Sequence, residues 1–230
     1  MTTQQLFAAL LCAASLSITG AAGAAGAASK SAAGNAEAGQ AKAAACAGCH
    51  GADGNSLAEI YAALKAPKIA GQVPEYLVKS LHDFKAGRRT NDSMSPQAQA
   101  VAEIDMADIA AWFASQKAKP NVAANKTLLA AGEKIYNKGK GRPDVVAACI
   151  GCHGLNGVGN RDWAKIMAVP PVILAPAIGG QHAGYISDQL LAYKAGKRAT
   201  DNGHVMRDIA GRLDEKDILA VAEYISTLKP

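Results

Sequence analysis

The chain has 230 residues, of which 50% are hydrophobic, and a formal net charge of +5 at pH 7. Residues 30–120 hold ten basic and nine acidic side chains, and residues 121–230 hold fourteen and ten, so the second half carries most of the excess. So mild an excess argues against nucleic acid as a partner, for which a clustered basic face would be expected, although it can steer an acidic protein partner.

The first thirty residues predict an export signal. No charged side chain precedes Lys30, and the apolar stretch Leu6–Ile18 has the length of a signal's hydrophobic region, too short to span a bilayer. The sequence AAGAAGAAS then offers small-residue cleavage positions, and we take residues 1–28 as the signal peptide. Its start departs from the usual pattern because it lacks Lys and Arg. Cys12 leaves with the signal.

The mature chain then holds four cysteines, in the motifs CAGCH (46–50) and CIGCH (149–153). C-x-x-C-H is the attachment signature of a c-type haem, whose porphyrin bonds to both thiols and whose iron binds the histidine. The sequence therefore predicts two haem c groups, the covalent bonds coming from Cys46, Cys49, Cys149 and Cys152 and one axial ligand from His50 and His153. A single zinc between the two cysteine pairs is the alternative, but it leaves both histidines unexplained.

The chain is a tandem repeat. The motifs match at an offset of 103 residues, APKIAGQ (66–72) matches APAIGGQ (175–181) at 109, and Met94 matches Met206 at 112. The rising offset indicates two insertions in the second copy, both in loop-like stretches.

Apolar spacing predicts helices in both copies. They are expected at Asn35–Ala45, Pro74–Ala86, Asp105–Gln116, Tyr185–Ala195 and Glu215–Leu228. No segment alternates as a strand would. The polar sequence QKAKPNVAANK (116–126) separates the copies. We expect an all-α protein with an N-terminal domain at 29–117, a linker at 118–126 and a C-terminal domain at 127–230, each domain small enough to need its haem as part of the core.

The second axial ligand must come from a distant segment. Met94 and Met206 occupy equivalent positions, and a thioether raises the reduction potential of the iron that it binds. Met106 aligns with Ile218 and is expected in the core; Met167 has no counterpart. His204 is a weaker candidate because it aligns with Asp92, and we expect His82 and His182 to be surface or packing residues.

Other repeated residues suit the surroundings of a haem. A ligating histidine usually donates its second N–H to an acceptor, and the carbonyls of Pro67 and Pro176 are candidates, although a simple loop proline is an equal alternative. Arg89 and Arg198 could pair with haem propionates or be solvated charges.

Together, the doubled C-x-x-C-H-G, P-x-[IL]-[AG]-G-Q, [FY]-K-A-G-x-R and M-x-x-x-A motifs resemble the bacterial dihaem cytochrome c4 family over essentially the whole mature chain. The resemblance implies two class I cytochrome c domains related by a pseudo-twofold axis, propionates near their interface, and His/Met ligation at both irons. It also implies that the proline carbonyls accept from the ligand histidines. Two departures, DNGHVM for NDSM and the insertion NRDWAKIMAVPPVIL, affect the second copy.

Three functions are compatible with these features. The first is a periplasmic electron carrier, not an enzyme, that passes electrons from a redox protein towards a terminal oxidase and meets the membrane only through its partners. The second is an electron-accepting subunit of a periplasmic dehydrogenase such as a sulfide-oxidising flavocytochrome. The third, a dihaem enzyme such as a peroxidase, needs an open iron, which two repeated methionines disfavour.

Overall fold

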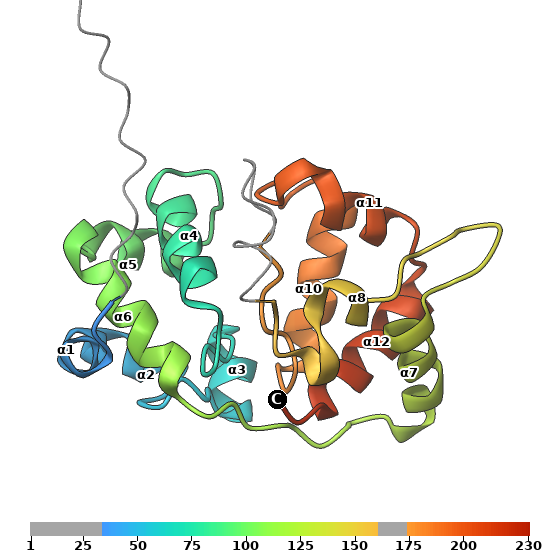
Figure 1. Cartoon of the computed structure of the whole chain (residues 1–230), viewed down its shortest axis with the longest axis horizontal. Coiled ribbons are helices and arrows are strands. Elements are labelled where there is room, and N and C mark those ends of the chain that lie inside the picture. Colours follow the sequence, from blue (N-terminus) through green and yellow to red (C-terminus); the bar gives the residue numbers. More distant parts are fainter. Residues whose placement is uncertain (1–33, 161–173) are drawn as a thin grey trace, which may run out of the picture. The chain divides into compact units, whose positions relative to one another are not determined.

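The computed structural model describes residues 34–160 and 174–230, and this part of the chain is helical (Figure 1). It contains two isolated antiparallel bridges but no strand. The all-α prediction is therefore confirmed for these residues. The expected signal peptide (1–28), Met167 and most of the insertion that begins at Asn160 lie outside the described residues. Among the described helices, none has the length and apolar character needed to cross a membrane.

The first repeat is organised around one long helix, α6. α1 packs along it, and α4 packs against both α6 and α5 (Figure 1). Pro74 begins α4, where its missing N–H costs nothing. The elements are α1 (Ala36–Lys42), η1 (Ala43–Cys46), α2 (Ala47–His50), α3 (Ala58–Leu64), α4 (Pro74–Lys85), α5 (Met94–Ala100) and α6 (Glu103–Ser115).

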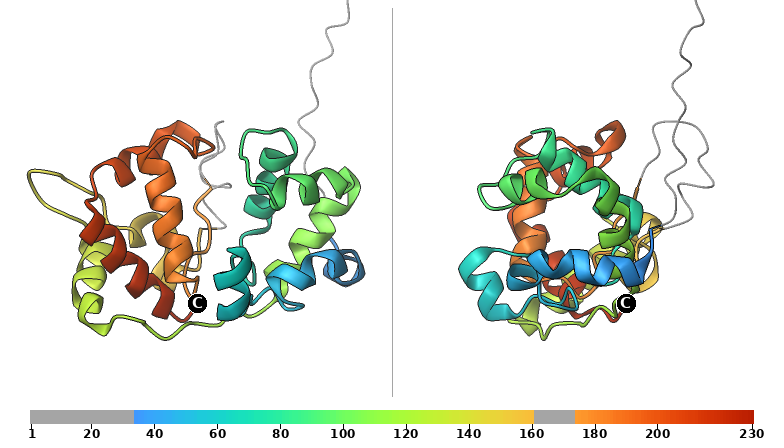
Figure 2. Two further views of the ribbon diagram at one scale, coloured as in Figure 1. Left: turned by 180° about the vertical axis from the view of Figure 1, so that it is seen from behind. Right: turned by 90° about the vertical axis from the view of Figure 1, so that its left-hand side faces the viewer.

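The second repeat has the same plan, with α12 in the place of α6. α7 and α10 both pack on α12, and α11 packs on α10 (Figure 2). Asp214 and Asp217 form a capping box at the start of α12, which fixes where this helix begins. The elements are η2 (Lys126–Leu128), α7 (Leu129–Lys138), α8 (Ile150–His153), η3 (Leu155–Gly157), α10 (Ala183–Lys194), η4 (Asn202–His204), α11 (Val205–Gly211) and α12 (Glu215–Thr227).

The predicted helices are present, with ends that differ by a few residues, whereas α3, α5, α7 and α11 were not predicted. α7 is the counterpart of α1, as the close packing of one glycine in each shows. A Cβ on Gly39 would lie 2.0 Å from the Asp108 carbonyl oxygen of α6, and one on Gly132 would lie 2.1 Å from the Ala220 carbonyl oxygen of α12. Only glycine permits helix backbones to approach so closely.

This correspondence reveals a third insertion in the second repeat. Gly39 precedes Cys46 by seven residues, but Gly132 precedes Cys149 by seventeen. The extra residues include a projecting loop (Figure 1) whose base is held by backbone hydrogen bonds of 3.0 and 3.1 Å between Lys140 and Val146. The sequence comparison, anchored on the motifs, found only the two later insertions.

The segment between α6 and η2 is hydrogen-bonded to both repeats, which belong to one compact unit of the chain. Asn55 binds its backbone, accepting from the Lys119 N–H at 2.9 Å and donating to the Lys117 carbonyl at 3.0 Å. Asn121 in turn donates to the carbonyls of Gly180 and Gln181, at 2.9 and 3.0 Å. The segment predicted as a linker is thus held against both repeats by hydrogen bonds.

Candidate haem sites

The two motif histidines are buried and hydrogen-bonded in the same way. His50 ends α2 and is 7% exposed, and its Nδ1 lies 2.7 Å from the carbonyl oxygen of Pro67. His153 ends α8 and is 8% exposed, with Nδ1 2.9 Å from the carbonyl oxygen of Pro176. Because a carbonyl can only accept, each Nδ1 donates its proton.

The protonation state of these histidines suits a metal ligand. Burial lowers the pKa of both His50 and His153, and the bonds to the proline carbonyls counter only part of that effect. Both imidazoles are therefore neutral at pH 7. With the proton on Nδ1, the lone pair of Nε2 is free for iron.

None of the four motif cysteines forms a disulfide; Cys49 is exposed and the other three are half-buried. Within residues 34–160 and 174–230, no group of three or more His, Cys, Asp or Glu side chains could hold a metal ion. The zinc alternative therefore lacks a donor set in this part of the chain.

The two candidate methionines start equivalent helices. Met94 is the first residue of α5 and Met206 the second of α11, and both are half-buried. The Asn91 carboxamide oxygen accepts from the backbone N–H of Met94 at 2.9 Å and fixes the chain there. Met106, in contrast, is 1% exposed inside α6, like its counterpart Ile218 in α12. Met94 and Met206 stay the predicted second ligands.

The other histidines have different surroundings. His204 is exposed. His82 is half-buried and its Nδ1 lies 3.2 Å from a Glu103 carboxylate oxygen. His182 is buried and stacks on Tyr61, with 4.6 Å between the ring centres. Nothing in the sequence indicated that His182 packs against a ring of the first repeat.

Arg89 and Arg198 lie where the two repeats meet. The Arg198 guanidinium donates to the Tyr76 hydroxyl at 2.6 Å and to the Gln189 carboxamide oxygen at 2.7 Å. That of Arg89 donates to the Tyr185 hydroxyl at 2.9 Å and to the same Gln189 oxygen at 3.0 Å. Two cations thus share one neutral acceptor.

The surroundings of Arg198 test whether a haem fits. Arg198 is 8% exposed, and its Nε is buried without a hydrogen-bond partner. Within residues 34–160 and 174–230, no Asp or Glu side chain forms an ion pair with it. A buried cation without a counter-ion is costly. A haem carries two propionate carboxylates, so it can supply the missing negative charge.

The core of the first repeat has an apolar face that is only partly covered. The hydrophobic cluster on α6 contains three buried side chains, Ala43, Ile109 and Phe113. Around them lie apolar side chains that are only partly buried, namely Cys46, Ile69, Leu77, Val101 and Trp112. A haem packed there would cover these side chains, and it would supply a one-electron Fe(III)/Fe(II) couple.

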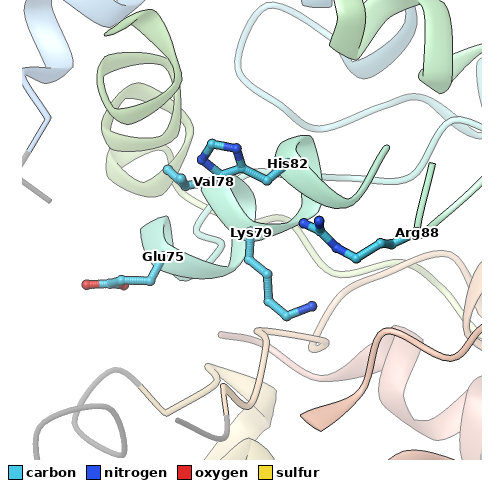
Figure 3. Close-up of a pocket in the computed structure, with 5 residues that line it drawn as sticks. All are labelled: Glu75, Val78, Lys79, His82 and Arg88. Carbon is cyan, nitrogen blue, oxygen red and sulfur yellow. The ribbon is translucent and has the colours of Figure 1, made fainter. Parts of the chain in front are cut away.

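A separate shallow pocket lies along α4 (Figure 3). It is lined by Glu75, Val78, Lys79, His82 and Arg88. Two of its cations share one counter-ion, because Lys79 Nζ and Arg88 Nε lie 2.5 and 2.8 Å from the carboxylate of buried Asp83. None of the predicted haem-binding residues lines this pocket.

Two helical repeats, each with a C-x-x-C-H motif whose buried histidine donates to a proline carbonyl, define a c-type cytochrome with two haem sites. The cytochrome c family profile matches residues 36–117 and 129–229. Cytochrome c4 from Pseudomonas aeruginosa is 42% identical over 178 residues, which span 77% of this chain and 80% of that protein. The crystal structure of reduced cytochrome c4 from Pseudomonas stutzeri superposes with a TM-score of 0.73 at 40% identity, covering 85% of this chain and 99% of that one.

The chain belongs to the cytochrome c4 family of dihaem electron carriers, and its cofactors are two haem c groups. A more distant relative is the thiosulfate dehydrogenase electron acceptor of Stutzerimonas stutzeri strain A1501. It is 31% identical over 169 residues, which span 73% of each chain.

Proposed function

We propose that this cytochrome is a periplasmic one-electron carrier of a respiratory chain that delivers electrons towards a terminal oxidase. Cys46 and Cys49 hold the first haem, and Cys149 and Cys152 the second. The iron ligands are His50 with Met94 and His153 with Met206. The observation that carries the proposal is the pair of buried, neutral histidines whose Nδ1 protons are bound by Pro67 and Pro176.

This ligand set suits transfer of electrons without bond chemistry. Two axial ligands leave the iron no open position for a substrate, and a thioether favours the ferrous state. Helices and buried hydrogen bonds hold the histidines, so the site changes little between oxidation states. Each repeat therefore exchanges one electron at a time.

The periplasmic location rests on residues 1–28. An apolar segment with small residues after it is typical of export. The second half of the chain carries an excess of four positive charges, which favours encounter with an acidic redox partner rather than with a nucleic acid. Any association with the membrane would then come through that partner.

A second function is favoured by one relative. The thiosulfate dehydrogenase electron acceptor resembles this chain over most of its length. We propose as the alternative that the cytochrome accepts electrons from a periplasmic dehydrogenase, for example one acting on reduced sulfur or a sulfide-oxidising flavocytochrome, as a subunit or close partner.

Stopped-flow mixing separates the two. The reduced holoprotein is mixed with solubilised membranes of its host, and the oxidised holoprotein with the host's periplasmic fraction plus thiosulfate or sulfide. Rapid, cyanide-sensitive oxidation by the membranes supports the oxidase role. Substrate-dependent reduction without oxidation by the membranes supports the dehydrogenase role and contradicts the first.

A further inference from the structure

Each repeat places a buried glutamine against the other repeat. Gln72, at the end of the first P-x-I-[AG]-G-Q motif, is 7% exposed. Its Oε1 accepts from the N–H of Ala177 at 2.7 Å and from its neighbour Val73 at 2.9 Å, while its Nε2 donates to the carbonyl of Ala177 at 2.9 Å. The side-chain amide thus pairs with a backbone residue across the boundary.

Gln181, at the end of the second motif, does the same in the opposite direction. It is 6% exposed, and its Oε1 accepts from the N–H of Lys68 at 2.9 Å and from that of His182 at 3.0 Å. Its Nε2 donates to the carbonyl of Lys68 at 2.7 Å. In both glutamines the oxygen meets two N–H groups and the nitrogen meets a carbonyl, which fixes the orientation of the amide.

These contacts reach the ligand histidines through one peptide group. The N–H of Ala177 and the carbonyl of Pro176 belong to the same peptide bond, and that carbonyl accepts from His153. A continuous chain therefore runs from Gln72 of the first repeat to His153 of the second. Likewise, the peptide bond between Pro67 and Lys68 joins Gln181 to His50.

We propose that each glutamine is a positioning residue for the histidine of the opposite repeat, so that Gln72 tunes the second haem and Gln181 the first. The inference rests on the proposed role of His50 and His153 as iron ligands. Hydrogen bonds in a chain polarise one another. An acceptor at the peptide N–H makes the carbonyl a stronger acceptor for the imidazole Nδ1–H, and the imidazole becomes a more basic ligand.

The direction of the effect follows from this polarisation. A more basic histidine donates more electron density and stabilises the ferric state, which lowers the reduction potential. Removing a glutamine amide therefore raises the potential of the haem in the other repeat. A glutamine that only packed its own repeat would act on its own haem or on neither.

The experiment compares Gln72→Leu and Gln181→Leu in the full holoprotein, each serving as the other's control. The two potentials are measured by optical redox titration and assigned to the two haems by NMR of their methyl groups. The Nδ1 proton resonances of His50 and His153 are recorded in the reduced protein as a direct report on each hydrogen bond. Gln→Met variants at both positions keep the side-chain length and replace any leucine variant that does not load haem.

The expected pattern is crossed. Gln72→Leu raises the potential of the haem on Cys149 and Cys152 and moves the His153 Nδ1 proton upfield, whereas Gln181→Leu does so for the haem on Cys46 and Cys49 and for His50. Shifts in the same repeat, equal shifts in both haems or unchanged potentials overturn the inference. Failure of the proposed His/Met ligation would be recognised separately, because the spectra of the wild-type protein would then lack the resonances of an iron-bound methionine.

Discussion

A methyl group added at Gly132 should separate the two helices on which the second repeat is built. The new Cβ would lie 2.1 Å from the Ala220 carbonyl oxygen and 2.7 Å from the Tyr224 Cβ. A backbone oxygen cannot rotate away, so α7 and α12 must move apart by more than an ångström to restore van der Waals contact. The core between them, which includes Ile135 and Val221, would loosen.

The magnitude follows from two opposing effects. Overpacking of this kind costs up to about 3 kcal/mol. Replacing glycine by alanine in a helix returns about 1 kcal/mol. Gly132→Ala should therefore reduce the free energy of unfolding by about 2 kcal/mol, which lowers Tm by roughly 4 to 8 °C for a chain of this size.

The assay is thermal and guanidinium unfolding of the holoprotein, followed by circular dichroism. Gly211→Ala is the matched control, because a Cβ on this exposed residue at the end of α11 meets no atom within 4 Å. Wild-type stability in Gly132→Ala, or an equal loss in Gly211→Ala, would refute the packing argument.

Three further predictions concern the sites and the junction between the repeats. Met94→His or Met206→His should lower one reduction potential and leave the other nearly in place; equal shifts in a redox titration would contradict independent ligation. Arg198→Leu should lower the potential of the adjacent haem because it removes a buried cation, which the same titration would show, whereas an unchanged potential would place this charge away from the haem. Burial, and then Lys68, lowers the pKa of His182 from 6.5 to about 4, so the unfolded chain binds more protons between these values. Stability should therefore fall as pH drops from about 6.5 to about 4, and urea unfolding of His182→Asn should lose this part of the pH dependence; an unaltered dependence in the variant would assign it to other groups.

The candidate haem-binding residues were predictable because each signal is local. A c-type haem needs two thiols and a histidine at fixed spacing, so His50 and His153 could be found without a structure. The long helices were predictable for the same reason, since apolar spacing in α4, α6, α10 and α12 reports one buried face.

Features that depend on packing between segments were missed. α7 and the extra loop after it were not predicted because the two copies were aligned on the motifs. The different spacings, seven residues from Gly39 to Cys46 and seventeen from Gly132 to Cys149, would have indicated the insertion. The repeated Gln72 and Gln181 were visible, but nothing in a linear repeat says that each contacts the other copy. The same holds for Gln189, whose counterpart in the first repeat is Ser80. Its side-chain oxygen accepts hydrogen bonds from both Arg89 and Arg198.

The central claim is that both irons are capped by histidine and methionine, and a redox titration of the purified mature protein, with carbon monoxide added to the reduced form, tests it most directly. The account predicts two one-electron steps at high potential and no binding of carbon monoxide. Binding of carbon monoxide at either haem, or one strongly negative potential, would show an open or differently ligated iron. Either result would contradict His/Met ligation at both irons and the electron-carrier function proposed from it.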